Sequence, residues 1–580
     1  MSKIQRIAAI VIALYLLLVL LDRFVLVELL VRRIGFSVLL AMLEAFAIIG
    51  VGFATRCAFA RVWRADDADL PRDLLLGYPL FGALCFLVGT LNVSTWSMGI
   101  VLVVCGLGGI YVVVRRFESR PPVIPVIAEP LVLVAIAIVF LCALIVAQAP
   151  PSSLDELAYH LAVPWTWVKE HRAIDLPLIS HSYFPLGIES TDLPLLSILG
   201  QIGGGIASHF LHLGAALAAT AMLFRLSRGN ALALAAIVTT PALALIAGWS
   251  LVDWPLIGIC AILVLALDDG DAATISIAIA AGLLTKYTFI PFAIITIAVA
   301  HRWRGVLPGL LLGSIFFIRN LILGANPIAP FFSAGAPHLS GYRAPFLSDY
   351  VFDGHFLDES LGASLIAACT LSAGTLAWIL VAAAVLLFLL APSSRILLPF
   401  LAIPAARSRR PTHLIRVLLG LATVVQLFLI AYFTDRGGAF SLLSGVSSDQ
   451  EFLTKQRASY ASTQTIDALL PADARVLVIG LNETYWFARR VRGGGNFDGP
   501  RVSRYLETPT SDALYARLKG DGITHVAVVA PPAPSTAVPQ KLAERDTALT
   551  PQAQRILAQT LDRFASNVVS RAGATVFTLR

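Results

Sequence analysis

Residues 131–146 read LVLVAIAIVFLCALIV and contain no charged side chain. A second run, 414–433, carries a single charge at Arg416. A helix needs about 20 mostly apolar residues to cross a bilayer, and these runs approach or reach that length. The composition agrees, because 57% of the 580 residues are hydrophobic and only 14% are charged, against about 25% charged in soluble domains. The chain is therefore predicted to be a polytopic α-helical membrane protein.

The basic residues indicate how the chain is oriented. The net charge of +7 comes from 43 Lys and Arg against 36 Asp and Glu. These cations cluster between apolar runs, as at Arg115 and Arg116, which is typical of cytoplasmic loops and gives no sign of nucleic-acid binding. With Lys3 and Arg6 in the cytoplasm and an uncleaved first helix, we expect a multi-pass protein of the bacterial inner membrane. About thirteen spans are expected, at about 7–21, 35–55, 73–90, 97–114, 130–147, 206–226, 231–247, 251–267, 305–323, 365–390 and 414–433, with shorter pieces at 272–285, 288–300 and 396–405.

Three regions follow from this pattern. Residues 1–125 hold the N-terminal helices, and residues 126–435 form a transmembrane core with external loops at 148–192 and 324–360. Residues 450–580 alternate apolar strands with amphipathic helices, which predicts a small α/β domain. Strands are expected at 475–480, 524–529 and 575–579, and helices at 462–470, 511–518 and 551–564. The number of preceding spans places this domain in the periplasm. It contains no glycine-rich phosphate-binding motif.

The first external loop carries the densest set of reactive side chains. Asp155 and Glu156 follow a membrane exit, and in a helix Asp155 would share a face with Tyr159 while Glu156 would share the next face with His160. Apolar residues on the other side predict an amphipathic helix lying along the membrane surface. The polar stripe is either a solvated face or a site for acid–base chemistry.

Two cations stand near the same membrane face. Lys286 separates two apolar pieces that are short for a span, and it is either a loop lysine at the lipid surface or part of an anion site at membrane depth. Arg319 comes one turn before a predicted exit, where it either reaches the interface or binds phosphate oxygens with its planar fork. Asp253 lies at a membrane exit as a loop acid or a site acid. Interrupted helices in lipid are expected to line a cavity or be buried in protein.

Several of these segments together resemble the GT-C superfamily, whose members are polytopic glycosyltransferases that use polyprenyl-phosphate sugars. The likeness is to the bacterial phospholipid-carrier-dependent branch, related to protein O-mannosyltransferases and the lipid A aminoarabinose transferase. It covers about residues 130–435. The acidic pair Asp155-Glu156 is its most specific element. Four helices precede the family's first helix, and the second acidic residue of the family is not identifiable. The segments that carry the resemblance are DELAYHL at 155–161, SYFPLGIES at 182–190, SLVDWPL at 250–256, GLLTKYT at 282–288 and RNLILGANPIAPFF at 319–332.

The resemblance implies a mechanism. Asp155 would act as general base on an acceptor hydroxyl, with Glu156 beside it, and inversion at the anomeric carbon is expected. A lipid-linked sugar would be the donor, a lipid or glycan the acceptor, and membrane lipids the surroundings. No cofactor is expected, and a divalent metal has no support because no ligand cluster has metal spacing. The remaining residues divide into a set for the donor phosphate (Lys286, Arg319, His160 and Tyr159) and a set for substrate binding (Glu189, Asp253 and Tyr287).

Two other functions fit part of the sequence. A transporter or flippase would also carry ionisable residues in the membrane, often with inverted repeats near its midplane. A polysaccharide polymerase or ligase would share the lipid-phosphate donor. The gathering of candidate residues at the outer face, beside a large external domain, favours surface chemistry over transport.

Overall fold

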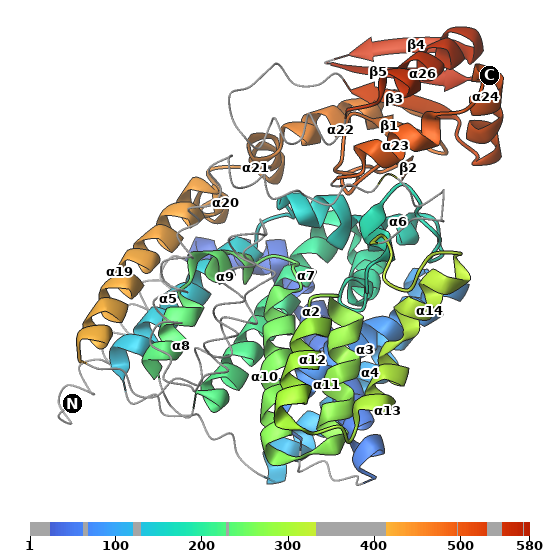
Figure 1. The fold of residues 1–580 in the computed structure, drawn as a ribbon. Helices are drawn as coiled ribbons and strands as arrows, with labels where there is room; N and C mark the ends of the chain where they lie inside the picture. Colours follow the sequence, from blue (N-terminus) through green and yellow to red (C-terminus); the bar gives the residue numbers. More distant parts are fainter. Residues whose placement is uncertain are drawn as a thin grey trace.

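A computed structural model describes residues 24–61, 68–119, 129–227, 231–331, 341, 413–495, 497–529, 548–571 and 573–580. Long helices form one part, and a small α/β domain caps one end of them (Figure 1). In the described residues five helices are long and apolar enough to cross a membrane. The predicted class, a polytopic helical membrane protein with a C-terminal α/β domain, is confirmed. The expected spans at 7–21, 365–390 and 396–405 lie outside the described residues, as does most of the 324–360 loop.

The N-terminal helices are α2 (Phe24–Ala60), α3 (Leu70–Leu91) and α4 (Thr95–Ser119). Their backbones touch at glycines: a Cβ on Gly109 would lie 1.7 Å from the carbonyl oxygen of Phe46, and one on Gly77 would lie 2.0 Å from that of Ile48. Small residues at such crossings allow van der Waals packing where lipid supplies no hydrophobic driving force. Helix α2 starts earlier than the predicted 35–55, because the apolar run continues through two arginines.

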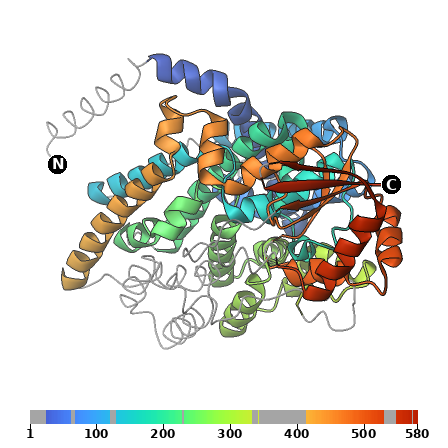
Figure 2. The ribbon, with the colours of Figure 1, turned by 90° about the horizontal axis from the view of Figure 1, so that it is seen from above.

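The central helices are α5 (Pro130–Ala147), α7 (Asp192–Leu226), α10 (Asp253–Asp269) and α19 (His413–Arg436). Helix α5 has the predicted bounds, and it runs beside α19 (Figure 2). Helix α7 begins before the predicted 206 and is kinked at Gly200, whose φ of +70° is left-handed. That backbone conformation favours glycine.

Three pairs of shorter helices replace or match the remaining predicted spans. The piece expected at 231–247 is divided into α8 (Ala231–Val238) and α9 (Pro241–Ile246), because proline removes a helical donor and restricts the residue before it. The piece expected at 305–323 is divided into α13 (Val306–Gly313) and α14 (Ile315–Ile322). The predicted short pieces appear as α11 (Ala272–Thr285) and α12 (Phe289–Ala300). Interrupted helices are therefore common in this part of the chain.

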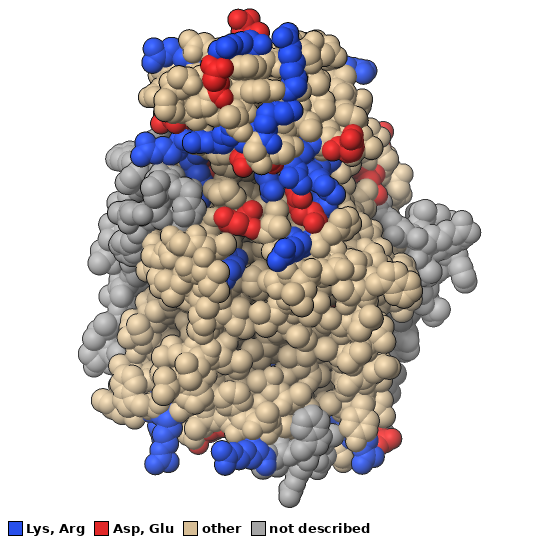
Figure 3. Space-filling model, turned by 90° about the vertical axis from the view of Figure 1, so that its right-hand side faces the viewer, with Lys and Arg blue, Asp and Glu red and all other residues tan. Residues whose placement is uncertain are grey.

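Charge is distributed as a membrane protein requires. On the face in Figure 3, Lys, Arg, Asp and Glu gather on the C-terminal domain and where it meets the helices, and again at the opposite end. A broad band of other residues separates the two sets. Large apolar side chains such as Trp96 and Leu131, each 83% exposed, stand on the helices. Exposed apolar surface of this extent indicates contact with lipid.

The C-terminal domain is built on a five-stranded sheet with the order β2-β1-β3-β5-β4. Strand β1 is parallel to β2 and β3, whereas β5 is antiparallel to β3 and β4. Separate apolar clusters pack within this domain. The predicted strands are confirmed, while β2, β4 and α23 were not predicted. The elements are α20 (Ala439–Leu443), α21 (Asp449–Gln456), α22 (Ala458–Leu469), β1 (Arg475–Ile479), β2 (Arg490–Arg492), α23 (Gly499–Leu506), α24 (Ser511–Gly520), β3 (His525–Val529), α26 (Pro551–Phe564), β4 (Ala565–Arg571) and β5 (Ala574–Leu579).

Candidate functional site

The 148–192 loop lies between the helices and the C-terminal domain (Figure 1). Its reactive stretch forms one widened turn, the π-turn (Glu156–His160), in which the Leu161 amide donates to the Glu156 carbonyl at 2.9 Å. Helix α6 (Ala162–Lys169) follows. Glu156, Tyr159 and His160 are buried. The prediction of an exposed amphipathic helix on the membrane surface is therefore wrong. Its polar residues Glu156 and His160 pair inside the protein with His209 and Glu189, and its apolar residues Leu157 and Leu161 pack against Tyr485 and Trp486 of the C-terminal domain. Single π-turns of this kind occur often at functional sites.

Asp155 stands at the start of the π-turn and is partly buried. It acts through space on His181, a buried imidazole of the same loop. Burial lowers the pKa of His181 to about 3, and Asp155 opposes this shift, while His160, Arg501 and Lys286 add to it. The acid and the lysine singled out in the sequence therefore both influence one histidine.

Glu156 is enclosed and fully engaged. One carboxylate oxygen accepts from the amides of Ser152 at 3.3 Å and Ser153 at 2.9 Å. The other accepts from the Ser250 amide at 2.7 Å and lies 2.8 Å from Nε2 of His209. Burial alone would raise the pKa of Glu156, but the His209 charge and these hydrogen bonds outweigh it and lower the pKa. With four partners in place, Glu156 ties the loop to α7 and to the segment just before α10, and it holds the residue next to it, Asp155.

A second carboxylate–histidine pair lies in the same loop. Nδ1 of His160 is 2.8 Å from Oε1 of Glu189, and both side chains are buried. The Tyr159 ring lies against two imidazoles, with centroid distances of 3.9 Å to His160 and 4.4 Å to His181. The structure thus brings together three residues that the sequence assigned to donor or substrate binding and adds His181, which the sequence reasoning missed although it immediately precedes a quoted motif.

Lys286 and Asp253 form an ion pair. Their side chains approach to 3.1 Å, with Lys286 20% exposed and Asp253 4% exposed. Lys286 ends α11 in extended backbone before α12 begins, and Asp253 begins α10. The predicted break between two short helices is therefore confirmed, and Asp253 lies beside the cation as its counter-charge.

Arg319 and Tyr287 hold the backbone at residues 182–183. The Arg319 guanidinium donates to the Ser182 carbonyl at 2.7 Å and to Asn320 Oδ1 at 2.8 Å. The Tyr287 hydroxyl lies 3.1 Å from the carbonyl oxygen of Tyr183, and its ring meets the edge of Phe184. The guanidinium also lies over the rings of Phe86, Tyr183 and Phe316, so backbone oxygens and aromatic faces surround its charge.

The C-terminal domain also reaches the loop. Asp498 accepts from the Ser180 amide at 3.1 Å, and Arg501 donates to the Pro177 carbonyl at 3.0 Å. The Phe497 ring lies 6.4 Å from that of His181. Burial raises the pKa of Asp498 to about 6, although Arg501 opposes this. No local pattern in the sequence marks these residues, because their role depends on which surface the domain meets.

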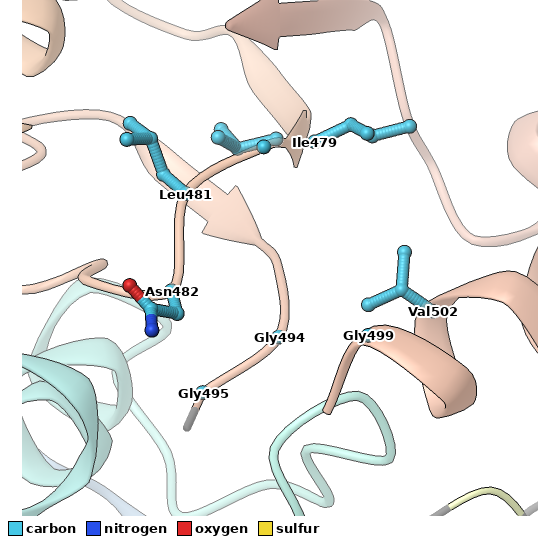
Figure 4. Close-up of a pocket in the computed structure, with 9 residues that line it drawn as sticks. Ile479, Leu481, Asn482, Gly494, Gly495, Gly499 and Val502 are labelled. Atoms are coloured by element: carbon cyan, nitrogen blue, oxygen red, sulfur yellow. The ribbon is translucent and has the colours of Figure 1, made fainter. Parts of the chain in front are cut away.

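A pocket lies in the C-terminal domain beside these contacts (Figure 4). Ile479 at the end of β1, with Leu481 and Asn482 after it, forms one side, and Gly494, Gly495 and Val502 form the other. Its wall touches the loop, since a Cβ on Gly495 would lie 3.4 Å from the carbonyl oxygen of Ala158. Among the described residues no three His, Cys, Asp or Glu side chains gather as a metal site would require.

The fold and site define a multi-pass membrane protein with an acid, a histidine and cations at the end covered by an α/β domain. No family model and no curated protein matches the chain. Among solved structures it is similar to ArnT from Cupriavidus metallidurans bound to undecaprenyl phosphate, with 15% identity, 77% of this chain and 96% of that chain covered, and a TM-score of 0.43. The apo state of the same protein gives 15% identity, coverages of 78% and 98%, and a TM-score of 0.46. These values are too low to assign a reaction or a substrate.

Proposed function

We propose that this protein is an integral-membrane glycosyltransferase. It moves a sugar from a polyprenyl-phosphate donor to an acceptor hydroxyl on the periplasmic face, with inversion at the anomeric carbon. The reaction class follows from the GT-C resemblance of the motifs quoted above. The carrier is proposed to be of the class to which undecaprenyl phosphate, the ligand of the ArnT complex, belongs.

The observation that carries the proposal is that residues 181–183 contact the segments of both candidate groups. Tyr159, four positions after Asp155, stacks on the His181 ring, and Tyr287, next to Lys286, donates to the Tyr183 carbonyl. Transfer from a phosphate ester needs an acid–base group near the acceptor and positive charge near the leaving phosphate. A lysine and a carboxylate around one buried polar centre supply both.

The proposed step balances without a cofactor. The acceptor hydroxyl attacks the anomeric carbon and gives its proton to Asp155. A new bond forms between acceptor oxygen and anomeric carbon, and the bond from that carbon to the phosphate oxygen breaks. The polyprenyl phosphate leaves with the electron pair, and Lys286 and Arg319 offset its charge. Attack opposite the leaving group inverts the anomeric centre.

The other candidate residues take supporting parts in this proposal. Glu156 holds the start of the π-turn through its four hydrogen bonds. Asp253 keeps Lys286 in place until a phosphate competes for it. Tyr159, His160 and Glu189 form the polar floor behind Asp155, and Tyr287 anchors the backbone that Arg319 also contacts.

Transfer of radiolabelled sugar from a polyprenyl-phosphate donor to bacterial membrane lipids and glycans tests the proposal. Wild-type protein should transfer label, and Asp155→Asn should reduce kcat by at least about 100-fold, the scale of a lost general base. Asp435→Asn makes the same chemical change at an exposed position in the last turn of α19 and should transfer normally. Full transfer by Asp155→Asn overturns the base assignment. Movement of the lipid between leaflets with no new glycosidic bond favours the flippase.

A further inference from the structure

Residues Thr484–Phe487, called here the interdomain segment, connect β1 to β2 in the C-terminal domain. The three aromatic residues Tyr485, Trp486 and Phe487 are 0%, 5% and 0% exposed. Tyr485 and Trp486 share an apolar cluster with Leu157 and Leu161 of the 148–192 loop. The structure places this aromatic stretch between the domain and the loop.

The interdomain segment binds the backbone of the π-turn directly. The amides of Thr484 and Tyr485 both donate to the Leu157 carbonyl, at 3.1 Å and 3.3 Å. Leu157 is fully buried and lies two positions after Asp155. A buried carbonyl is unfavourable unless a donor pairs with it. The C-terminal domain therefore stabilises the turn that carries the candidate base.

Gln201 of the membrane helix α7 and Lys169 of the 148–192 loop hold the interdomain segment in register. Nε2 of Gln201 donates to the carbonyls of Tyr485 at 2.6 Å and Phe487 at 3.3 Å, and the Tyr485 hydroxyl donates back to the Gln201 carbonyl. Lys169 donates to the Phe487 carbonyl at 3.0 Å. Gln201 follows the kink at Gly200 in α7, so the break in that helix lies next to the contact.

We propose that the interdomain segment positions Asp155 for catalysis and that Gln201 is the positioning residue through which the membrane helices fix the segment. This inference rests on the proposed transferase function. The C-terminal domain is then part of the catalytic unit and not a separate binding module. Displacing a reacting group by about 1 Å can cost about 100-fold in rate, so a looser turn lowers turnover while the donor site at Lys286 stays intact.

The test replaces Gln201 in the full-length protein in detergent or vesicles. Gln201→Met keeps the side-chain length and removes the donor, so kcat should fall by about 10- to 100-fold while donor affinity stays within about twofold. Gln554→Met, on exposed α26 and remote from the loop, is the matched control and should behave as wild type. If Gln201→Met does not fold, Tyr485→Phe removes only the hydroxyl contact and should give a smaller fall in kcat.

Hydrogen exchange gives a second readout that needs no substrate. Amides of Thr484, Tyr485 and the π-turn should exchange faster in Gln201→Met than in Gln554→Met. Unchanged exchange and unchanged kcat in Gln201→Met overturn the inference, as does an equal loss of kcat and donor affinity. If wild-type protein has no transferase activity, the proposed function fails on its own, and faster exchange in the variant still demonstrates the contact between the segment and the turn.

Discussion

Replacing Glu156 with Gln should destabilise the protein even though the two side chains have nearly the same shape. The Glu156 carboxylate accepts from two amides on one oxygen and from the Ser250 amide and His209 on the other. An amide side chain has one oxygen and one NH2 group. Whichever way it is oriented, its NH2 group faces at least one backbone amide that has lost its acceptor.

The magnitude follows from the number of donors left unpaired. If the NH2 group faces the Ser250 amide, one buried donor is orphaned, and His209 can become an acceptor by changing tautomer. If it faces the amides of Ser152 and Ser153, two are orphaned. Each orphan costs about 1–3 kcal/mol, so the cheaper orientation sets an expected loss of about 1–3 kcal/mol, before the loss of charge-assisted bonding to His209.

Thermal unfolding in detergent, followed by tryptophan fluorescence, measures this loss, with Asp155→Asn as the neighbouring comparison. Both variants change a carboxylate to an amide one position apart. Glu156→Gln should lower the melting temperature clearly more than Asp155→Asn, because Glu156 is fully buried and Asp155 is only partly buried. In the transfer assay the order should reverse, with Asp155→Asn losing more activity per folded molecule. Equal stability of Glu156→Gln and wild type would refute the assignment of Glu156 as a structural acceptor.

Three further outcomes are expected. Gly82→Ala should prevent correct folding, because its Cβ would lie 1.6 Å from a carbonyl oxygen of the 148–192 loop. Gly108→Ala is the control, since a Cβ there meets open space and the variant should melt like wild type. The yield of detergent-stable monomer compares the two variants. Lys286→Met should weaken donor binding and lower the melting temperature, because it leaves Asp253 buried without its cation. Adding Asp253→Asn should restore the melting temperature. It should not restore donor affinity, which is measured by titration with polyprenyl phosphate. Burial lowers the pKa of His181 to about 3. As the pH falls, the unfolded chain therefore binds a proton at this histidine at about pH 6.5, before the folded protein does. Its contribution to stability is therefore complete above pH 6.5 and decreases as pH falls towards 3, by up to about 1.4 kcal/mol per unit; a melting series in which His181→Phe shows as steep an acid loss as wild type would contradict this.

The sequence predicts the elements whose signal is local. Helix α5 has the bounds read from its apolar run, and the break between α11 and α12 falls at Lys286 as expected. Strands β1, β3 and β5 appear where short apolar runs predicted them. Strand β2 was missed because it reads Arg-Val-Arg, and β4 because it is exposed along most of its length. Pairing with a neighbour, and not side-chain pattern, makes those two segments strands.

The site was predictable only in part for a related physical reason. The sequence pattern identifies Asp155, Glu156 and Lys286 as candidate site residues, because charged groups beside apolar runs are unusual. It does not show which side of a turn will be covered. His209 becomes a partner of Glu156 through a contact 53 positions along the chain, and the amides of Thr484 and Tyr485 reach the π-turn from the C-terminal domain. Such partners depend on the packing of whole elements and leave no mark in a local pattern.

The N-terminal helices, which precede the region covered by the GT-C resemblance, also help to hold the loop of the candidate site. The loop residue Thr191 donates to the Tyr78 carbonyl of α3 at 3.2 Å, and the Gly187 amide donates to the Leu284 carbonyl of α11 at 2.8 Å. Leu284 lies two positions before Lys286. The loop that ends at α7 is thus fixed by α3 on one side and by the end of α11, next to the candidate phosphate-binding lysine, on the other. Because these backbones meet at glycines with no room for a Cβ, a shift of α3 would move the loop against Lys286, and this gives the additional helices a direct part in setting the distance between the acid and the cation.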